Sequence, residues 1–232
     1  MSFLVFLLIC ILPIQDSQVR RIELVVEPAV LAVGKTASLS WSVKGGGKIF
    51  VSHVGSVQSS GRIEIKPEQT TTYTLVAEGN NAVFTKTITV DVTGSKGENE
   101  FPNETNFKYP IVSKLVWPSF PELLQHIQSV LQDTMTFTLN EYLKSDGQYV
   151  FVTNQSQRPD LVKKAETRIG ARRIAYLVEV ARENPKSEGH TYTIKALIEY
   201  RRKVERSWRG EADESMYQQQ TRRLQAIING KP

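Results

Sequence analysis

Hydrophobic and polar residues alternate at a period of two through most of residues 21–93. Apolar, β-branched and aromatic residues come in short stretches, and glycine or asparagine lies between the stretches. This pattern predicts β-strands that bury one face, and strands that follow one another without helices favour an antiparallel β-sandwich. The six expected strands are residues 22–28, 37–43, 48–54, 62–68, 71–79 and 84–92.

The same alternation predicts which side chains of this sandwich are buried. Leu39, Trp41 and Val43 fall on one face of their strand. Tyr73 and Leu75 are expected to meet the same core from another strand. We therefore interpret Trp41 as a core residue, and the alternative for its ring is stacking on a carbohydrate.

The second half of the chain, residues 111–232, contains both the period of two that is typical of strands and the spacing of three and four that is typical of helices. Apolar residues recur at spacings of three and four in a helix expected from about Pro121 to Lys144. A continuous apolar strand follows at residues 148–154, and a short basic helix is expected at 159–173. The remaining expected elements are a strand at residues 111–118, three strands at 175–181, 192–199 and 204–213, and a closing helix at 215–229.

A hairpin and a linker complete the predicted organisation. Arg201, Arg202 and Lys203 are expected to form the tight connection between the last two strands. Residues 94–110 are rich in Gly, Asn, Glu and Pro, which predicts an exposed linker. The expected fold therefore has two domains, an all-β sandwich at 21–93 and an α/β domain of order β-α-β-α-β-β-β-α at 111–232.

Charge points to one candidate surface. The formal net charge of the 232-residue chain is +5, and residues 108–232 hold twenty Lys+Arg against fourteen Asp+Glu. Acids are interspersed with these basic residues, and the basic helix lacks interleaved aromatic residues, so we expect no nucleic-acid partner. A candidate partner-binding edge lies on the predicted hairpin and consists of Arg201, Arg202, Lys203, Arg206 and Arg209.

Motifs for catalysis or metal binding are missing from the sequence. It has no phosphate-binding glycine loop, no nucleophile elbow and no zinc-protease motif. The three histidines, His53, His126 and His190, lie far apart, and Cys10 is the single cysteine. We therefore expect a protein that is not an enzyme and that holds no metal and no cofactor.

The amino terminus carries an apolar stretch, residues 3–14, that is short for a membrane-spanning helix. It is similar to the hydrophobic core of a secretory signal, so residues 1–20 are interpreted as an export signal. Cys10 is a candidate for lipidation, which would tether the chain to a membrane. Leu8 and Ile9 precede it, where the usual lipoprotein signal has a small residue immediately before the cysteine.

Two motifs in residues 21–93 are typical of one family. Gly34, Leu39 and Trp41 are spaced as in an early motif of bacterial immunoglobulin-like domains, and residues 70–75 read TTTYTL, as their later motif does. The segment therefore resembles a bacterial immunoglobulin-like domain. Such modules act mostly as spacers or adhesive surfaces, so the resemblance implies a fold and leaves the function open.

The second half resembles another family through its order of elements. Residues 142–152 lead from a helix into a strand, and Ile169-Gly170-Ala171 forms a turn ahead of the next strand. These features resemble the family of the curli-channel periplasmic domain, the lipoprotein activators of penicillin-binding proteins and the Tol amino-terminal domain.

The two resemblances imply a non-enzymatic accessory protein that binds or helps assemble another bacterial envelope component, a peptidoglycan synthase or secretion machinery. The expected location is the periplasm or the outer membrane. The expected partner is an envelope protein or a second copy of the chain. The alternative is a surface adhesin or carbohydrate-binding protein that acts through the immunoglobulin-like domain.

Overall fold

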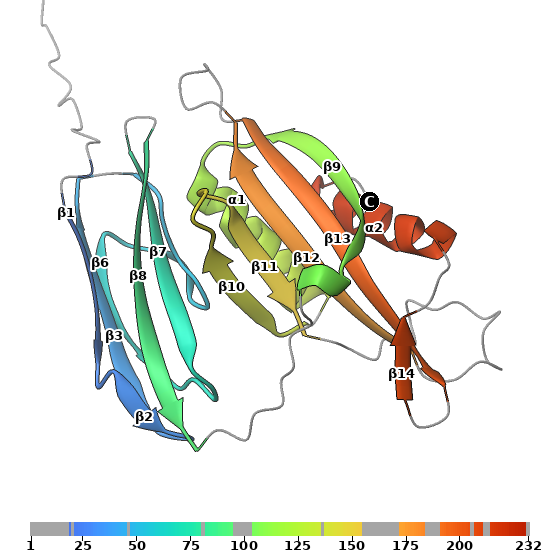
Figure 1. Ribbon diagram of the computed structural model, residues 1–232. Helices are drawn as coiled ribbons and strands as arrows, with labels where there is room; N and C mark the ends of the chain where they lie inside the picture. The colour runs from blue at the N-terminus through green and yellow to red at the C-terminus, as the bar shows by residue number, and fades with distance from the viewer. Residues whose placement is uncertain are drawn as a thin grey trace, which may run out of the picture.

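The described part of the protein is mostly β-structure, as the alternation predicts. It forms three sheets and two α-helices (Figure 1). A computed structural model describes residues 19, 21–45, 47–79, 82–94, 104–135, 137–154, 172–183, 191–204, 207–210 and 214–230.

The first part of the chain folds into two sheets that face each other, and we call β1 to β8 the sandwich. One sheet has the order β1-β3-β6, and the other has the order β2-β8-β7-β4-β5 with β2 parallel to β8. Side chains from both sheets form one core between them. The strands are β1 (Arg21–Glu27), β2 (Val30–Ala32), β3 (Ala37–Lys44), β4 (Ile49–Val51), β5 (Gly55–Val57), β6 (Ser60–Ile65), β7 (Thr71–Gly79) and β8 (Ala82–Thr93).

The six strands predicted here are present, and the structure adds the short strands β2 and β5. Trp41 is a core residue, as predicted, and is 9% exposed. Its indole N–H donates to the carbonyl oxygen of Gln58 at 2.9 Å. Gly61 lies so close to the ring that a Cβ there would be 2.5 Å from Cζ2 of Trp41. Tyr73 and Leu75 are buried in the same core, which also confirms their prediction.

The second part of the chain is built on one sheet, and we call it the helix–sheet region. The sheet order is β10-β11-β12-β13-β14, and β9 also pairs with β13. β13 is therefore central, with β12 on one side and β9 and β14 on the other. The elements are η1 (Glu104–Asn106), β9 (Lys108–Val116), α1 (Phe120–Ser129), η2 (Val130–Thr134), β10 (Leu139–Leu143), β11 (Tyr149–Thr153), β12 (Arg172–Arg182), β13 (Thr191–Val204), β14 (Ser207–Gly210) and α2 (Glu214–Ile228).

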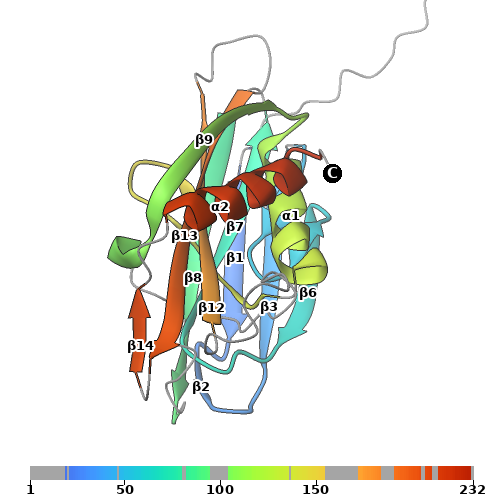
Figure 2. The same ribbon diagram turned by 90° about the vertical axis from the view of Figure 1, so that its right-hand side faces the viewer.

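Both α-helices pack on the same face of this sheet, and Figure 2 shows α2 crossing in front of its strands. Leu124 and Ile127 of α1 and Leu224 and Ile228 of α2 are fully buried there. α2 agrees with the predicted closing helix. The apolar stripe on each helix thus faces one core, which also takes in one face of the sheet.

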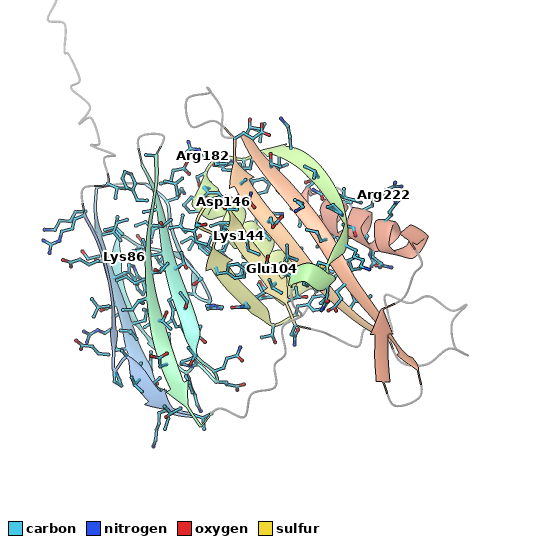
Figure 3. The ribbon with its side chains drawn as sticks, viewed as in Figure 1. Lys86, Glu104, Lys144, Asp146, Arg182 and Arg222 are labelled. Atoms are coloured by element: carbon cyan, nitrogen blue, oxygen red, sulfur yellow. The ribbon has the colours of Figure 1, made fainter. Side chains whose placement is uncertain are left out.

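The opposite face of the sheet carries a smaller apolar cluster and a row of ion pairs. Phe107 is 6% exposed and belongs to this cluster. Lys144 Nζ lies 3.1 Å from a carboxylate oxygen of Glu104 and 2.6 Å from one of Glu179, and Lys195 Nζ lies 2.7 Å from the other oxygen of Glu179. Figure 3 shows Glu104 and Lys144 on this face. The described end of the predicted linker therefore belongs to this region, because residues 104–107 lie against the sheet and residues 108–110 begin β9.

The prediction of a helix from Pro121 to Lys144 is wrong in its second half. α1 ends at Ser129, the π-helical turn η2 continues to Thr134, and the chain then forms β10. Leu139 and Leu143 are spaced by four, as in a helix, but both pair with β11. Pairing with a neighbouring strand decided the conformation, because local propensity is weaker than tertiary contacts.

The hairpin between the last two strands is confirmed, but its predicted turn is misplaced. Arg201, Arg202 and Lys203 belong to β13, which continues to Val204. Val204 then pairs with Ser207 at the end of the hairpin. β14 therefore begins at Ser207, three residues later than the predicted strand at 204–213.

Other predictions lie outside the described residues. They concern most of the export signal with Cys10, the first part of the linker at 95–103, and the basic helix through residue 171. The last two residues of that predicted helix, Arg172 and Arg173, are instead the first residues of β12.

Candidate functional site

The basic residues singled out from the sequence lie at one end of the sheet. Arg201, Arg202 and Lys203 are near the end of β13, and Arg209 is in β14. Arg206, between the two strands, lies outside the described residues. The structure thus brings four of the five predicted positions to neighbouring strand ends.

Strand pairing adds two more arginines to this end. Arg202 is in register with Arg172 of β12 on one side and with Arg209 of β14 on the other. Arg201 is in register with Arg173 of β12. The backbone register thus places cationic residues opposite one another on three neighbouring strands.

We call this set of cationic residues the basic strand end. It consists of Arg172, Arg173, Arg201, Arg202, Lys203 and Arg209. The acidic residue of β13 that lies closest to it along the strand is Glu199, which is 5% exposed.

A second cluster lies where the sandwich meets the helix–sheet region, and we call this contact the junction. β4 is buried along its whole length and β7 from Tyr73 onward. Leu75 faces the sandwich core, whereas Phe50 and Val76 are fully buried in the core that includes α1. The rings of Phe50 and Tyr149 meet edge to face, with centroids 6.0 Å apart. The two regions therefore share one hydrophobic core.

Glu78 of β7 connects the sandwich to the start of α1. One carboxylate oxygen accepts the backbone N–H of Phe120, the first residue of α1, at 2.6 Å, and the other lies 3.4 Å from the guanidinium of Arg182. Figure 3 shows Arg182 between the two regions. Ser119 caps the same helix, because its hydroxyl accepts the backbone N–H of Glu122 at 3.3 Å. A carboxylate is favourable at the positive end of a helix, so Glu78 supports α1 from the other region.

Glu141 of β10 is the centre of a buried polar cluster at the junction, and it is 1% exposed. One carboxyl oxygen accepts from the side-chain amide of Gln128 at 3.1 Å and from the backbone N–H of His53 at 3.4 Å. The other accepts the hydroxyl of Tyr149 at 3.0 Å. His53 lies in the turn between β4 and β5, with a φ of 61°, and its Nδ1 is 3.7 Å from Glu141.

Burial shifts the three ionisable groups of this cluster toward their neutral forms. Removal from water raises the pKa of Glu141 to about 7, although three hydrogen bonds to its carboxyl act in the opposite direction. Burial also lowers the pKa of His53 to about 4. The pKa of Tyr149 is raised well above its ordinary value, first by burial and then by the neighbouring Glu141. The arrangement can hold a proton inside the protein near neutral pH.

Sequence reasoning missed the whole junction. Glu78 follows the continuous apolar residues Leu75, Val76 and Ala77, and that break in the alternation was the available signal. His53 and Glu141 are 88 residues apart, and no local pattern connects them.

The described residues contain no helix that is both long enough and apolar enough to cross a membrane. Within the same ranges, no group of three or more His, Cys, Asp or Glu residues is arranged to hold a metal ion. Comparison of the chain with models of known families and with curated proteins gave no match.

Proposed function

We propose that the protein is a non-enzymatic accessory protein of a bacterial cell envelope and that it binds another envelope component, a peptidoglycan synthase or secretion machinery. The basic strand end carries this proposal, because strand pairing places six cationic residues at one end of the sheet. Arginine is suited to such contacts, since its planar guanidinium binds a carboxylate through two parallel hydrogen bonds. The expected complement is an acidic surface on a protein partner.

The sandwich, proposed here as immunoglobulin-like, serves as a spacer or a second contact surface. The shared core at the junction supports this role, because Phe50 and Val76 tie the sandwich to α1 and β11. A spacer attached in this way has a fixed direction relative to the basic strand end. A carbohydrate-binding role through Trp41 has less support, because the ring is buried against Gly61.

The test is crosslinking of the full-length protein in its native envelope, followed by mass spectrometry of the captured proteins. We expect one acidic envelope protein to be captured by the wild type. The double variant Arg202→Glu, Arg209→Glu should lose it, because two cations in register become anions. The matched control is Lys35→Glu, Lys86→Glu, which makes the same change in net charge at two exposed positions of the sandwich.

Purified partner and protein then give a direct measurement. Binding should weaken with rising salt concentration and should be lost in the first double variant, provided that circular dichroism shows both variants folded. Equal capture by the wild type and by both double variants would contradict the proposal. Capture of only a second copy of the chain would replace it with self-assembly.

A further inference from the structure

Two ionisable side chains from different regions face each other inside the junction. Glu141 belongs to the helix–sheet region and His53 to the sandwich. Among the described residues, the other titratable groups that face them are both phenols. Tyr149 donates to Glu141, and the ring of Tyr73 lies edge to face with that of His53 at 5.5 Å between centroids. The charge state of this polar cluster therefore depends on Glu141 and His53, and the Glu78–Arg182 ion pair forms a separate contact of the junction.

The surroundings of His53 suit a neutral imidazole. Its Nε2 is buried and has no hydrogen-bond partner among the described residues. Its Nδ1 lies 3.7 Å from Glu141, which is longer than a hydrogen bond. A protonated imidazole has two N–H donors, and a buried donor without a partner is costly.

The surroundings of Glu141 can accept a protonated carboxyl. Tyr149 donates to Glu141, and the hydroxyl of Ser52 is a second polar neighbour of its phenol. Each hydroxyl can donate one hydrogen bond and accept others. The acid proton of Glu141 can therefore be donated to the oxygen of Tyr149, which then donates to Ser52. Ser52 also accepts the backbone N–H of Thr74 at 2.8 Å, so it stays anchored in either arrangement.

We propose that Glu141 and His53 are buried as an uncharged pair when the junction closes, with Glu141 holding the proton that His53 carries in the unfolded chain. On closing, an imidazolium and a carboxylate become an imidazole and a carboxylic acid. One N–H bond breaks and one O–H bond forms, so no proton enters or leaves the protein. The physical advantage is that two groups are removed from water without burying two charges.

The pH range follows from the pKa values. In the unfolded chain the ordinary pKa values are 4.5 for Glu141 and 6.5 for His53, so between these values the proton is on the histidine. In the folded protein the values are about 7 and about 4, so over the same range the proton is on the glutamate. Above pH 7 the closed junction contains a buried carboxylate.

Nitrogen NMR of the full-length protein with labelled histidine tests the proposal directly. At pH 5.5 the ring of His53 should be neutral, whereas an exposed histidine at that pH is mostly charged. The variants His126→Gln and His190→Gln identify the remaining signal as His53. A charged ring of His53 at pH 5.5 in the folded protein would overturn the proposal and indicate a buried ion pair.

Two variants give a second measurement by denaturant unfolding. Glu141→Gln imitates the protonated carboxyl, so its stability at pH 5.5 should be close to that of the wild type. As the pH rises from 5 to 8.5, the variant should become more stable relative to wild type. The ratio of its unfolding equilibrium constant to that of wild type should fall on the order of 100-fold. His53→Asn replaces the histidine with a residue that tolerates positive φ. As the pH rises from 5 to 8.5, the ratio of its unfolding equilibrium constant to that of wild type should rise on the order of 30-fold, opposite to the change in Glu141→Gln. A loss that is the same at every pH would show a merely structural role and contradict the proposal.

Discussion

The two sheets of the sandwich use their outer faces differently. In β3, buried core residues alternate with half-buried serines, so one face packs and the other lies toward solvent. In β7, every residue from Tyr73 to Gly79 is buried. Val76 and Glu78 on its outer face contact the helix–sheet region, while Leu75 faces the sandwich core. β3 therefore packs against one hydrophobic core, whereas β7 packs against two.

This difference indicates where the two regions depend on each other. A substitution on the outer face of β1, β3 or β6 changes solvent contacts, and such substitutions usually have small effects. A substitution on the outer face of β4 or β7 removes packing from α1 and β11. It should therefore destabilise both regions together.

The largest effect is expected from Phe50→Ala. Phe50 is fully buried in the shared core, so the substitution should lower the free energy of unfolding by about 4 kcal/mol. The matched control is Phe84→Ala on β8 of the same sheet, where the side chain is 37% exposed and the loss should be below about 1 kcal/mol.

Denaturant unfolding measures this prediction with two fluorescent reporters. Trp41 lies in the sandwich core, and Trp117 stacks on His126 in the helix–sheet region, with ring centroids 4.8 Å apart. In variants that keep either Trp41 or Trp117 and lack the other two of the three tryptophans, Phe50→Ala should move both transitions by the same amount. A shift of the Trp41 transition alone would show that the sandwich unfolds independently.

A smaller loss, about 3 kcal/mol, is expected from Glu78→Ala, because it removes the buried carboxylate that pairs with Arg182 and that accepts the first N–H of α1. Glu64→Ala on exposed β6 is the control and should have little effect. Hydrogen exchange at the amino end of α1 provides the measurement. Unchanged protection there in Glu78→Ala would argue against support of the helix by the sandwich.

Gly61→Ala should lower stability by about 2 kcal/mol, because the new Cβ would collide with the ring of Trp41. This prediction tests the comparison of the two sheets, because Gly61 lies in β6, in the sheet that packs against the sandwich core alone. Gly34→Asn is the control, since its site is open and asparagine tolerates the φ of +81°. Calorimetry measures the loss, and Trp41 fluorescence should change only in Gly61→Ala.

The smallest effect is expected from pH in the wild type. The pKa of Glu141 is raised to about 7, so its contribution to stability falls as pH rises from 4.5 through 7. The pKa of His53 is lowered to about 4, so its contribution falls as pH decreases from 6.5 through 4. The two slopes oppose each other, and the pair should change stability by no more than about 1 kcal/mol between pH 5 and pH 8.5. A double variant, Glu141→Gln with His53→Asn, should therefore show nearly the same pH profile as the wild type, and a markedly different profile would contradict this cancellation.

Much of the fold could be predicted from local pattern. The alternation in β3 and the continuous apolar residues of β11 predicted both strands, because each pattern reflects burial on one face or on two. β10 was missed because Leu139 and Leu143 fit a helical spacing. The end of β13 was missed because three consecutive cationic residues suggested a turn, whereas β12 and β14 pair with them on both sides.

The candidate site was less predictable for a different physical reason. The sequence indicated the basic residues of β13 and β14, but their alignment with Arg172 and Arg173 depends on strand register. The junction depends on contacts between residues far apart in the chain, such as Ser56 and Gln125, which are 69 positions apart. Single-sequence periodicity contains no information about such pairs.

The shared core also has a consequence for synthesis. The ribosome makes β4 and β7 before α1 and β11, so a newly made sandwich exposes Phe50, Val76 and the carboxylate of Glu78 to water until more than forty further residues have emerged. An exposed apolar patch of this kind is a binding site for chaperones and a starting point for aggregation. The nascent chain should therefore need protection from aggregation most during the interval in which the sandwich has been made and the helix–sheet region is still being translated.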